Sequence, residues 1–350
     1  MAEDHERNDT QMKNHTNGIY DRFPSLAKKP LRFGKDGKFK ILCISDIQET
    51  VSFSPVTEKA ISVLLDTEKP DLVLLLGDNC NGPKIGSEEE MRRYAQKLSS
   101  FFESRDLPWA HVWGNHDHEV ALNKELQQSI YTSLPGCLSF NAPGVSGQSN
   151  FVLPILGSAD DRIRFNVWGL DSGSHINTFA SEILGEQRDL WEEARSVNER
   201  FRFQSVFGLL AFDRLVWYFN TSKAIEEENG FKPAALLVTH VAPWEMINVV
   251  ADAEKCGSVG RTTEGYALNT FNSGLFSAIL QRGDVKAVCS GHTHRNDVCG
   301  EYCGIRLCSD GSIGYSAYGD ADTRGGRIYE IDEKDPYAFT TRMVHTIDLI

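Results

Sequence analysis

Six side chains of the types that bind transition metals occur in this chain, each shortly after an apolar segment. Carboxylates, imidazoles and one amide oxygen suit Mn, Fe, Zn or related ions, and thiolates typical of a structural zinc site are missing from the set. Taken alone, Asp46 or Asp78 could cap a helix and His240 could be a core histidine. Taken together, the residues favour a metal site. The set is Asp46, Asp78, Asn115, His240, His292 and His294.

The segments before these residues are typical of a parallel sheet covered by helices. Apolar runs at residues 39–45, 71–76 and 109–113 predict strands, and amphipathic runs at about 56–68 and 87–103 predict the helices between them. Sites in open α/β sheets form at the carboxyl ends of the strands, where loops converge. We therefore expect the metal-type residues to meet at one edge of a sheet.

The chain beyond residue 150 is predicted to hold more strands and fewer helices. We find no internal repeat and no low-complexity linker, so the sequence predicts a flexible N-terminal arm at residues 1–36 and a single domain at residues 37–350. Two further strands are expected between residues 326 and 349. The other predicted strands are at residues 150–154, 162–170, 234–239, 285–290 and 305–309, and helices are predicted near 212–229 and 273–282.

Composition and charge exclude some classes of partner. The chain has 350 residues and a formal net charge of −13, from 36 Lys and Arg against 49 Asp and Glu. Nucleic-acid binders usually carry a basic face, so we expect no nucleic-acid partner. The N-terminal residues do not resemble a signal peptide, and no run of about 18 apolar residues occurs. We therefore expect a cytoplasmic protein without a membrane partner.

The eight cysteines are scattered along the chain, as expected of reduced intracellular thiols. Cys299, Cys303 and Cys308 lie close enough in sequence to raise the alternative of a zinc site. Their spacing contains no CxxC pair and they fall among strand-like residues. Buried small side chains are therefore the favoured interpretation.

Five short blocks resemble, in order, the motifs of the calcineurin-like metallophosphoesterases. The family pattern is D-x-H, G-D, G-N-H-D/E, H and G-H-x-H, and the similarity runs from about residue 40 to residue 294. Residues 296–300 and 307–319 also resemble a eukaryotic subgroup described as purple-acid-phosphatase-like or yeast cell-cycle phosphatase-like. The blocks are Asp46-Ile47-Gln48, Gly77-Asp78-Asn79, Gly114-Asn115-His116-Asp117, His240 and Gly291-His292-Thr293-His294.

The resemblance implies an α/β fold, a four-layer α-β-β-α sandwich of two mixed sheets flanked by helices. It also implies two divalent or trivalent transition-metal ions at the strand ends, such as Mn, Fe or Zn. A carboxylate is suited to bridge two cations because it has two oxygens. One ion would be held by Asp46, Asp78 and His294, and the other by Asp78 with Asn115, His240 and His292.

Such a centre would hydrolyse a phosphate ester with a metal-bound hydroxide. Two cations roughly 3.5–4 Å apart can hold the attacking and departing oxygens and lower the pKa of a bridging water. The resemblance implies that His116 protonates the leaving alkoxide and that Asp117 orients its ring. A phosphomonoesterase is favoured. Alternatives are a phosphodiesterase, a nuclease, which the acidic charge disfavours, and a non-catalytic phosphate- or metal-binding protein.

Two residues depart from the family pattern. Gln48 stands where most of the family has histidine, so it is a weak candidate ligand of the first metal. Asn81 stands where purple acid phosphatases have a tyrosine, three residues after the bridging aspartate, so no purple charge-transfer colour is expected.

The walls of the substrate pocket are expected in two polar, loop-rich segments, residues 172–207 and 251–266. Arg261 or Arg295 could steady a phosphate oxygen, although a solvated surface arginine explains each of them as well. The substrate would be a phosphorylated small molecule or a phosphoprotein. The sequence does not indicate which, nor does it indicate an oligomeric state.

Overall fold

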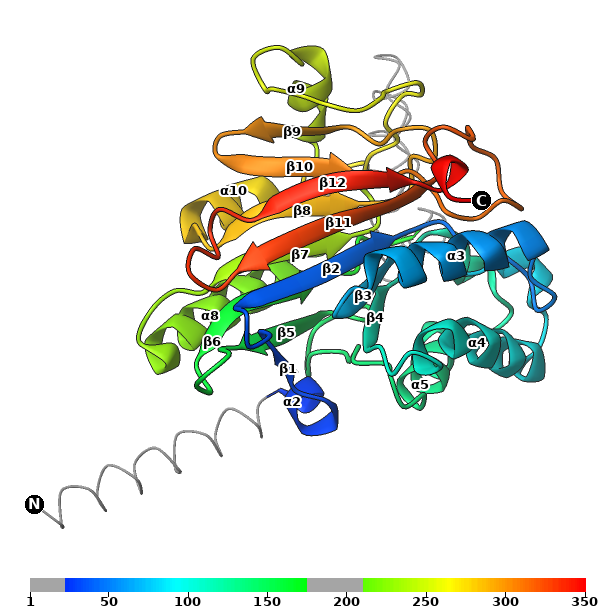
Figure 1. Cartoon of the computed structure of the whole chain (residues 1–350), viewed down its shortest axis with the longest axis horizontal. Helices are drawn as coiled ribbons and strands as arrows, with labels where there is room; N and C mark the ends of the chain where they lie inside the picture. The colour runs from blue at the N-terminus through cyan, green and yellow to red at the C-terminus, as the bar shows by residue number, and fades with distance from the viewer. Residues whose placement is uncertain (1–22, 175–209) are drawn as a thin grey trace, which may run out of the picture.

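The computed structural model describes residues 23–174 and 210–350, which form two mixed sheets packed face to face (Figure 1). The five-stranded sheet has the order β12 (Thr340–His345), β11 (Gly325–Asp332), β2 (Lys38–Ile44), β3 (Leu72–Leu76) and β4 (Trp109–Val112). The seven-stranded sheet has the order β1 (Leu31–Arg32), β5 (Phe151–Leu156), β6 (Ile163–Gly169), β7 (Ala234–Thr239), β8 (Val285–Ser290), β10 (Ile305–Ser309) and β9 (Cys299–Tyr302).

Helices cover the outer face of each sheet, which confirms the predicted four-layer sandwich (Figure 1). The five-stranded sheet packs against α3 (Pro55–Glu68), α4 (Glu88–Glu103) and α5 (Lys124–Thr132). The seven-stranded sheet packs against α8 (Phe212–Asn229), α9 (Met246–Ala251), α10 (Leu275–Arg282) and the short α2 (Pro24–Lys28). Single 3-10 turns are η1 (Gly82–Lys84), η2 (His116–Glu119) and η5 (Thr346–Asp348).

The central strands are buried on both faces, which is why their sequences are continuously apolar rather than alternating. On β2, Ile41 and Cys43 lie in the core between the sheets, whereas Leu42 and Ile44 pack under the helices. This alternation follows from the two-residue period of a strand.

The crossover helices fix the direction of the strands. In α4, the Ser87 side chain accepts a hydrogen bond from Glu90 N at 3.2 Å and caps the first turn, while Met91, Tyr94 and Leu98 form its buried face. Because α3 and α4 return the chain to the same end, β2, β3 and β4 are parallel. Strands β6, β7 and β8 are parallel as well. Each sheet therefore presents several carboxyl ends at one edge.

Two expectations need correction. The described part of the predicted arm, residues 23–36, is ordered: α2 packs into the core and β1 pairs in parallel with β5. Residues 1–22 lie outside the described residues. The prediction of reduced thiols is wrong for Cys299 and Cys308, which face each other across β9 and β10 and form a disulfide, with Cys303 exposed beside them.

Helices α2, α5 and α9 and strands β1 and β9 were not predicted, because each is too short to give a clear signal in the sequence. Over the two described ranges, the helices all fall short of the length and apolar character needed to cross a bilayer.

Candidate metal centre

The candidate ligands follow five strand ends drawn from both sheets. Asp46, Asp78 and Asn115 follow β2, β3 and β4 of the five-stranded sheet, while His240 and His292 follow β7 and β8 of the other. Both sheets therefore contribute to one site, at the edge where their parallel strands end.

The backbone at this edge is held in an uncommon conformation. Asp46, Gln48, Asp78 and His292 have φ values of 52°, 42°, 48° and 68°, in the left-handed region that non-glycine residues seldom adopt. Such residues persist where the surrounding structure fixes them, and they gather at functional sites. Here the amide of Asp46 donates to Gly77 O and the amide of Gln48 donates to Asp78 O, each at 3.1 Å.

Motif glycines allow the strand ends to approach closely. A Cβ atom at Gly77 would lie 2.6 Å from His240 Nδ1, and one at Gly291 would lie 2.8 Å from Asp46 Oδ2. Any larger residue at these two positions would push candidate ligands apart.

Two groups of side chains in the described part of the chain could each hold a metal ion. One consists of Asp46, Asp78 and His294, and the other of Asp78, His240 and His292, with the ligand atoms of each group within 4.8 Å of one another. Asp78 belongs to both groups. Asn115 joins the second group, since its Oδ1 lies 3.1 Å from His240 Nε2.

Two of the histidines are oriented by backbone carbonyls. The Nδ1 atom of His240 lies 2.8 Å from Leu76 O, and that of His294 lies 2.8 Å from Tyr318 O. A ring that donates Nδ1–H to a carbonyl presents the lone pair of Nε2 to the other side, which is the usual arrangement of a metal-binding histidine. The Nε2 atom of His294 faces Asp46 Oδ1 at 3.0 Å.

The pKa values of the side chains in the site depend strongly on one another. Burial works to lower the pKa of His240, but Asp78 and Asp46 outweigh it and raise that pKa to about 10. Burial and the neighbouring His240 lower the pKa of His292 to about 3. The pKa of Asp78 lies below its usual range because His240 more than offsets the effect of burial. In the protein alone, a proton on His240 thus balances the carboxylates.

The donor set fits a metal ion. Nitrogen atoms of two rings, His240 Nε2 and His292 Nδ1, lie 3.2 Å apart and converge on the same carboxylates. Asp46 Oδ1 is buried and lies 3.0 Å from His294 Nε2. Lone pairs that converge in a buried site repel one another unless a proton or a cation lies between them. A cation would satisfy all of these atoms at once.

Gln48 also lies in the cluster. Its side-chain Nε2 donates to Asp78 Oδ2 at 2.9 Å, so the amide stabilises the shared carboxylate. The side chain is buried. Whether its oxygen binds a metal stays a prediction.

His116 lies at the exposed side of the site. Its Nε2 is 4.0 Å from Asp78 Oδ2, and its Nδ1 is 2.5 Å from Glu119 Oε2. Burial works to lower the pKa of His116, but Asp78 and Glu119 raise it overall. These two carboxylates therefore favour the protonated form of the ring.

The role expected of Asp117, to orient the ring of His116, stays a prediction, because the hydrogen bonds of its carboxylate in the described residues go elsewhere. The carboxylate of Asp117 is buried and accepts hydrogen bonds from the amides of Gly114 and Asn79, at 2.8 and 3.0 Å. It thereby ties the end of β4 to the end of β3. Burial and Asp78 raise its pKa to about 6. Glu119, three residues after His116 in the same turn, contacts the Nδ1 atom of the ring and was not among the predicted site residues.

The two arginines proposed to bind phosphate are engaged elsewhere. Arg261 forms an ion pair with Asp322, and both side chains are about half exposed. Arg295 lies 3.3 Å from Asp320 and over the ring of Tyr318, which stacks on His294 at 4.0 Å between centroids. Residues 175–207 of the predicted pocket wall lie outside the described residues.

Comparison with known proteins points to one family. Residues 39–296 match the profile of the calcineurin-like phosphoesterases. The chain is 27% identical over 343 residues to a protein of Arabidopsis thaliana named probable inactive purple acid phosphatase 29, a match that covers 88% of this chain and 81% of that protein. It is 27% identical over 293 residues to phosphatase DCR2 of Saccharomyces cerevisiae, covering 75% of this chain and 45% of that protein.

A solved structure shares the fold. The crystal structure of a dimetal phosphatase from Danio rerio superposes with a TM-score of 0.53 at 13% identity, covering 87% of this chain and 98% of the other.

Proposed function

Because the chain belongs to the calcineurin-like phosphoesterase family, we propose that it is a metal-dependent phosphoric ester hydrolase that acts chiefly on phosphomonoesters. The observation that carries this proposal is the position of Asp78, which lies in two adjacent groups of metal-type side chains. A shared carboxylate between two ligand groups supports a binuclear rather than a mononuclear centre. The substrate would be a phosphorylated small molecule or a phosphoprotein.

The ligands divide between two ions. Bound metal ions supply Lewis acidity toward phosphate oxygens and lower the pKa of a water nucleophile. Asp46 and His294 would complete the first site. Asn115, His240 and His292 would complete the second, in which the neutral amide of Asn115 avoids excess negative charge near an anionic phosphate.

His116 would donate the proton that the leaving alkoxide needs. Glu119 fixes Nδ1, and Nε2 then points toward the cluster, where Asp78 Oδ2 lies 4.0 Å away. The side chain is 40% exposed, so a substrate can reach the Nε2–H group. Asp78 and Glu119 outweigh burial and raise the pKa of His116, which favours the protonated ring that a general acid needs.

A second candidate is a non-catalytic phosphate- or metal-binding protein on the same fold. Two observations favour it: Gln48 replaces the usual histidine and donates to Asp78, and the Arabidopsis relative carries the word inactive in its name. Loss of Asp78 or His116 would have favoured it further, but both are present.

One set of assays separates these functions. The full chain, purified without chelator, is tested on phenyl phosphate and on diphenyl phosphate, then after chelation and after Mn²⁺ or Zn²⁺ is added back. Hydrolysis of phenyl phosphate that chelation abolishes and metal restores is the expected result. Faster cleavage of the diester would indicate a phosphodiesterase. Metal binding without hydrolysis of either ester would favour the non-catalytic alternative.

A further inference from the structure

A cavity of about 230 Å³ lies beside the candidate metal centre. His118 of η2, Lys124 at the start of α5, and Asp171 after β6 line it, together with Gln148 and Arg214. The cavity shares η2 with His116. Ser172 lies between the lining residues Asp171 and Gly173, and its Oγ accepts a hydrogen bond at 3.0 Å from the amide of Val241, the residue after His240.

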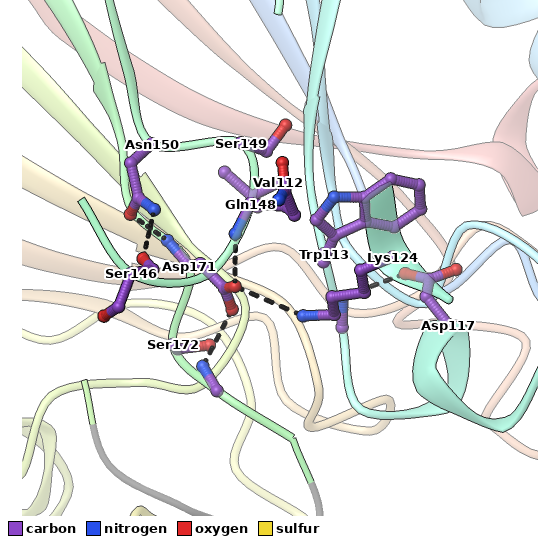
Figure 2. A network of polar contacts seen from close by, with 12 residues as sticks. Val112, Trp113, Asp117, Lys124, Ser146, Gln148, Ser149, Asn150, Asp171 and Ser172 are labelled. Carbon is purple, nitrogen blue, oxygen red and sulfur yellow. Dashed lines mark hydrogen bonds and ion pairs between the residues drawn. The ribbon is translucent and has the colours of Figure 1, made fainter. Parts of the chain in front are cut away.

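The carboxylate of Asp171 connects several residues of the cavity wall through hydrogen bonds (Figure 2). Its Oδ2 accepts from Lys124 Nζ at 3.2 Å and from the amide of Gln148 at 3.0 Å, and its Oδ1 accepts from the amide of Gly173 at 2.9 Å. Arg214 Nη1 lies 3.8 Å from Oδ1. The carboxylate is fully satisfied within the chain, so it serves to hold the two cations in place.

The two cationic side chains carry N–H groups that donate to no acceptor among the described residues. Lys124 Nζ carries three hydrogens and, among the described residues, donates only to Asp171. Arg214 uses Nε for Ser146 O and Nη1 for Asp171 O, which leaves Nη2 without an acceptor in the described part of the chain. The Nε2 atom of His118 is buried and has no hydrogen-bond partner there. These three side chains all line the same cavity.

Charge in the wall is also out of balance. The side chains of Lys124 and Arg214 are 11% and 4% exposed, against one buried carboxylate, Asp171. Glu125 is exposed at the rim and accepts from Gln148 Nε2 at 3.3 Å. Asp117 and Asp213 also act on Lys124 and Arg214, but neither lines the cavity. The buried side chains that line the cavity therefore carry one net positive charge. Buried cations with unused donors are costly unless an anion completes them.

We propose that this cavity binds an anionic group, a carboxylate or a phosphate, on the alcohol portion of the substrate, through Lys124, Arg214 and His118. This inference rests on the proposed function, in which His116 protonates the leaving group on the same turn. The alcohol therefore leaves beside the cavity. A space of 230 Å³ is small for a ligand pocket, so the substrate class is a small phosphorylated acid rather than a peptide.

The test compares three aryl phosphates that differ in one group: phenyl phosphate, 4-carboxyphenyl phosphate and 1,4-phenylene bisphosphate. We expect the metal-loaded full chain to hydrolyse at least one of the latter two with a kcat/KM about tenfold above that of phenyl phosphate. The carboxylate and the bisphosphate distinguish the two kinds of anion. Equal kcat/KM for all three would overturn the inference, whereas no hydrolysis of any would overturn the proposed function.

A matched pair of variants locates the effect. Lys124→Gln removes the charge but can still donate to Asp171, and it should lower the preference for the second anion about tenfold. The control Lys97→Gln, on the exposed side of α4, should leave that preference unchanged. An unchanged preference in Lys124→Gln would count against the cavity.

Two further measurements keep the test decisive. If Lys124→Gln does not fold, Glu125→Gln at the rim takes its place. This variant should raise the preference for the second anion, because it removes a nearby negative charge. An unchanged preference in Glu125→Gln would contradict the inference. If no ester is hydrolysed, calorimetry with the same three compounds on the metal-loaded chain replaces kinetics. Equal affinities would then rule the anion site out.

Discussion

At the candidate metal centre, Asp46 and Asp78 face histidines, whereas Asp171 in the neighbouring cavity faces Lys124 and Arg214. Both regions bury carboxylates, but the partners differ in kind. Imidazoles can be neutral or charged, so the first region depends on a proton or a metal ion for its balance. Ammonium and guanidinium groups stay charged, so the two cations of the second region keep their charge beside the single buried carboxylate of Asp171.

The atoms that each region offers to a ligand also differ. The metal centre gathers carboxylate oxygens and ring nitrogens, whereas the cavity leaves donors on Lys124 and Arg214 in the described residues. On the two proposals above, a cation would complete the first region and an anion the second. A phosphorylated acid with bound metals would satisfy both, and removal of single groups should affect the two regions differently.

The largest effect on rate is expected at His116. His116→Ala should lower kcat by roughly 10²- to 10⁴-fold on substrates whose alkoxide needs a proton, because a positioned acid is lost. Metal content and thermal stability should stay near wild type. Kinetics on phenyl phosphate and on 4-nitrophenyl phosphate, whose leaving group needs less protonation, check this. Equal losses on both would mean that His116 positions phosphate rather than donating a proton.

The largest effect on stability is expected at Asp171. Asp171→Asn leaves Lys124 and Arg214 without their buried counter-charge and should reduce the free energy of unfolding by about 3–5 kcal/mol. Urea denaturation measures the loss, which should be the same with and without metal. The control Asp66→Asn removes an exposed pair with Arg105 and should cost less than about 1 kcal/mol. If the loss in the free energy of unfolding of Asp171→Asn depended on metal, it would contradict the expectation that the two regions are stabilised independently.

The two regions should also respond to acid at different pH values. Asp78 and Asp46 raise the pKa of His240 to about 10, so metal binding must displace a proton and should weaken steadily as the pH falls below that value. The pKa of Asp171 is lowered, because Lys124 and Arg214 outweigh burial. Its contribution to stability is therefore present above the unfolded value of about 3.9 and lost only below it.

Metal release followed with a chelating dye, alongside circular dichroism from pH 8 to pH 3, tests this order. As the pH is lowered, metal should be released at a higher pH than the one at which the protein unfolds. A single transition in both signals would contradict it.

The smallest effect is expected at Gln48, which donates to Asp78 at 2.9 Å. Gln48→His should tighten the first metal site about tenfold, because imidazole is a better ligand than an amide. Gln48→Ala should weaken metal binding less than Asp46→Ala does. Calorimetric titration of metal into the chelated protein measures both. Affinities unchanged in Gln48→His would exclude this side chain from the site.

Local patterns predicted the strands and the cluster of metal-type residues, whereas the four-layer sandwich was implied by the resemblance to the family. The apolar run before Asp78 is a strand buried on both faces, and a polar residue directly after such a strand must lie at the sheet edge. The cavity could not be predicted in this way. Lys124, Asp171 and Arg214 are far apart in the chain, and no motif links them.

The partners of predicted residues were also hard to infer. Asp117 was assigned to His116 by its place in the motif, yet its carboxylate accepts from Gly114 and Asn79. That choice depends on how closely β3 and β4 approach. The disulfide between Cys299 and Cys308 likewise depends on strand register, which two cysteines nine residues apart do not specify.

Metal stoichiometry tests the central claim most directly. Protein purified without chelator is analysed for metals, then depleted and titrated with Mn²⁺ or Zn²⁺ by calorimetry, for the wild type and for Asp78→Asn. The account predicts two ions per chain in the wild type and loss of both high-affinity sites in Asp78→Asn, because this carboxylate belongs to both ligand groups. One ion per chain, or two that survive in Asp78→Asn, would contradict it.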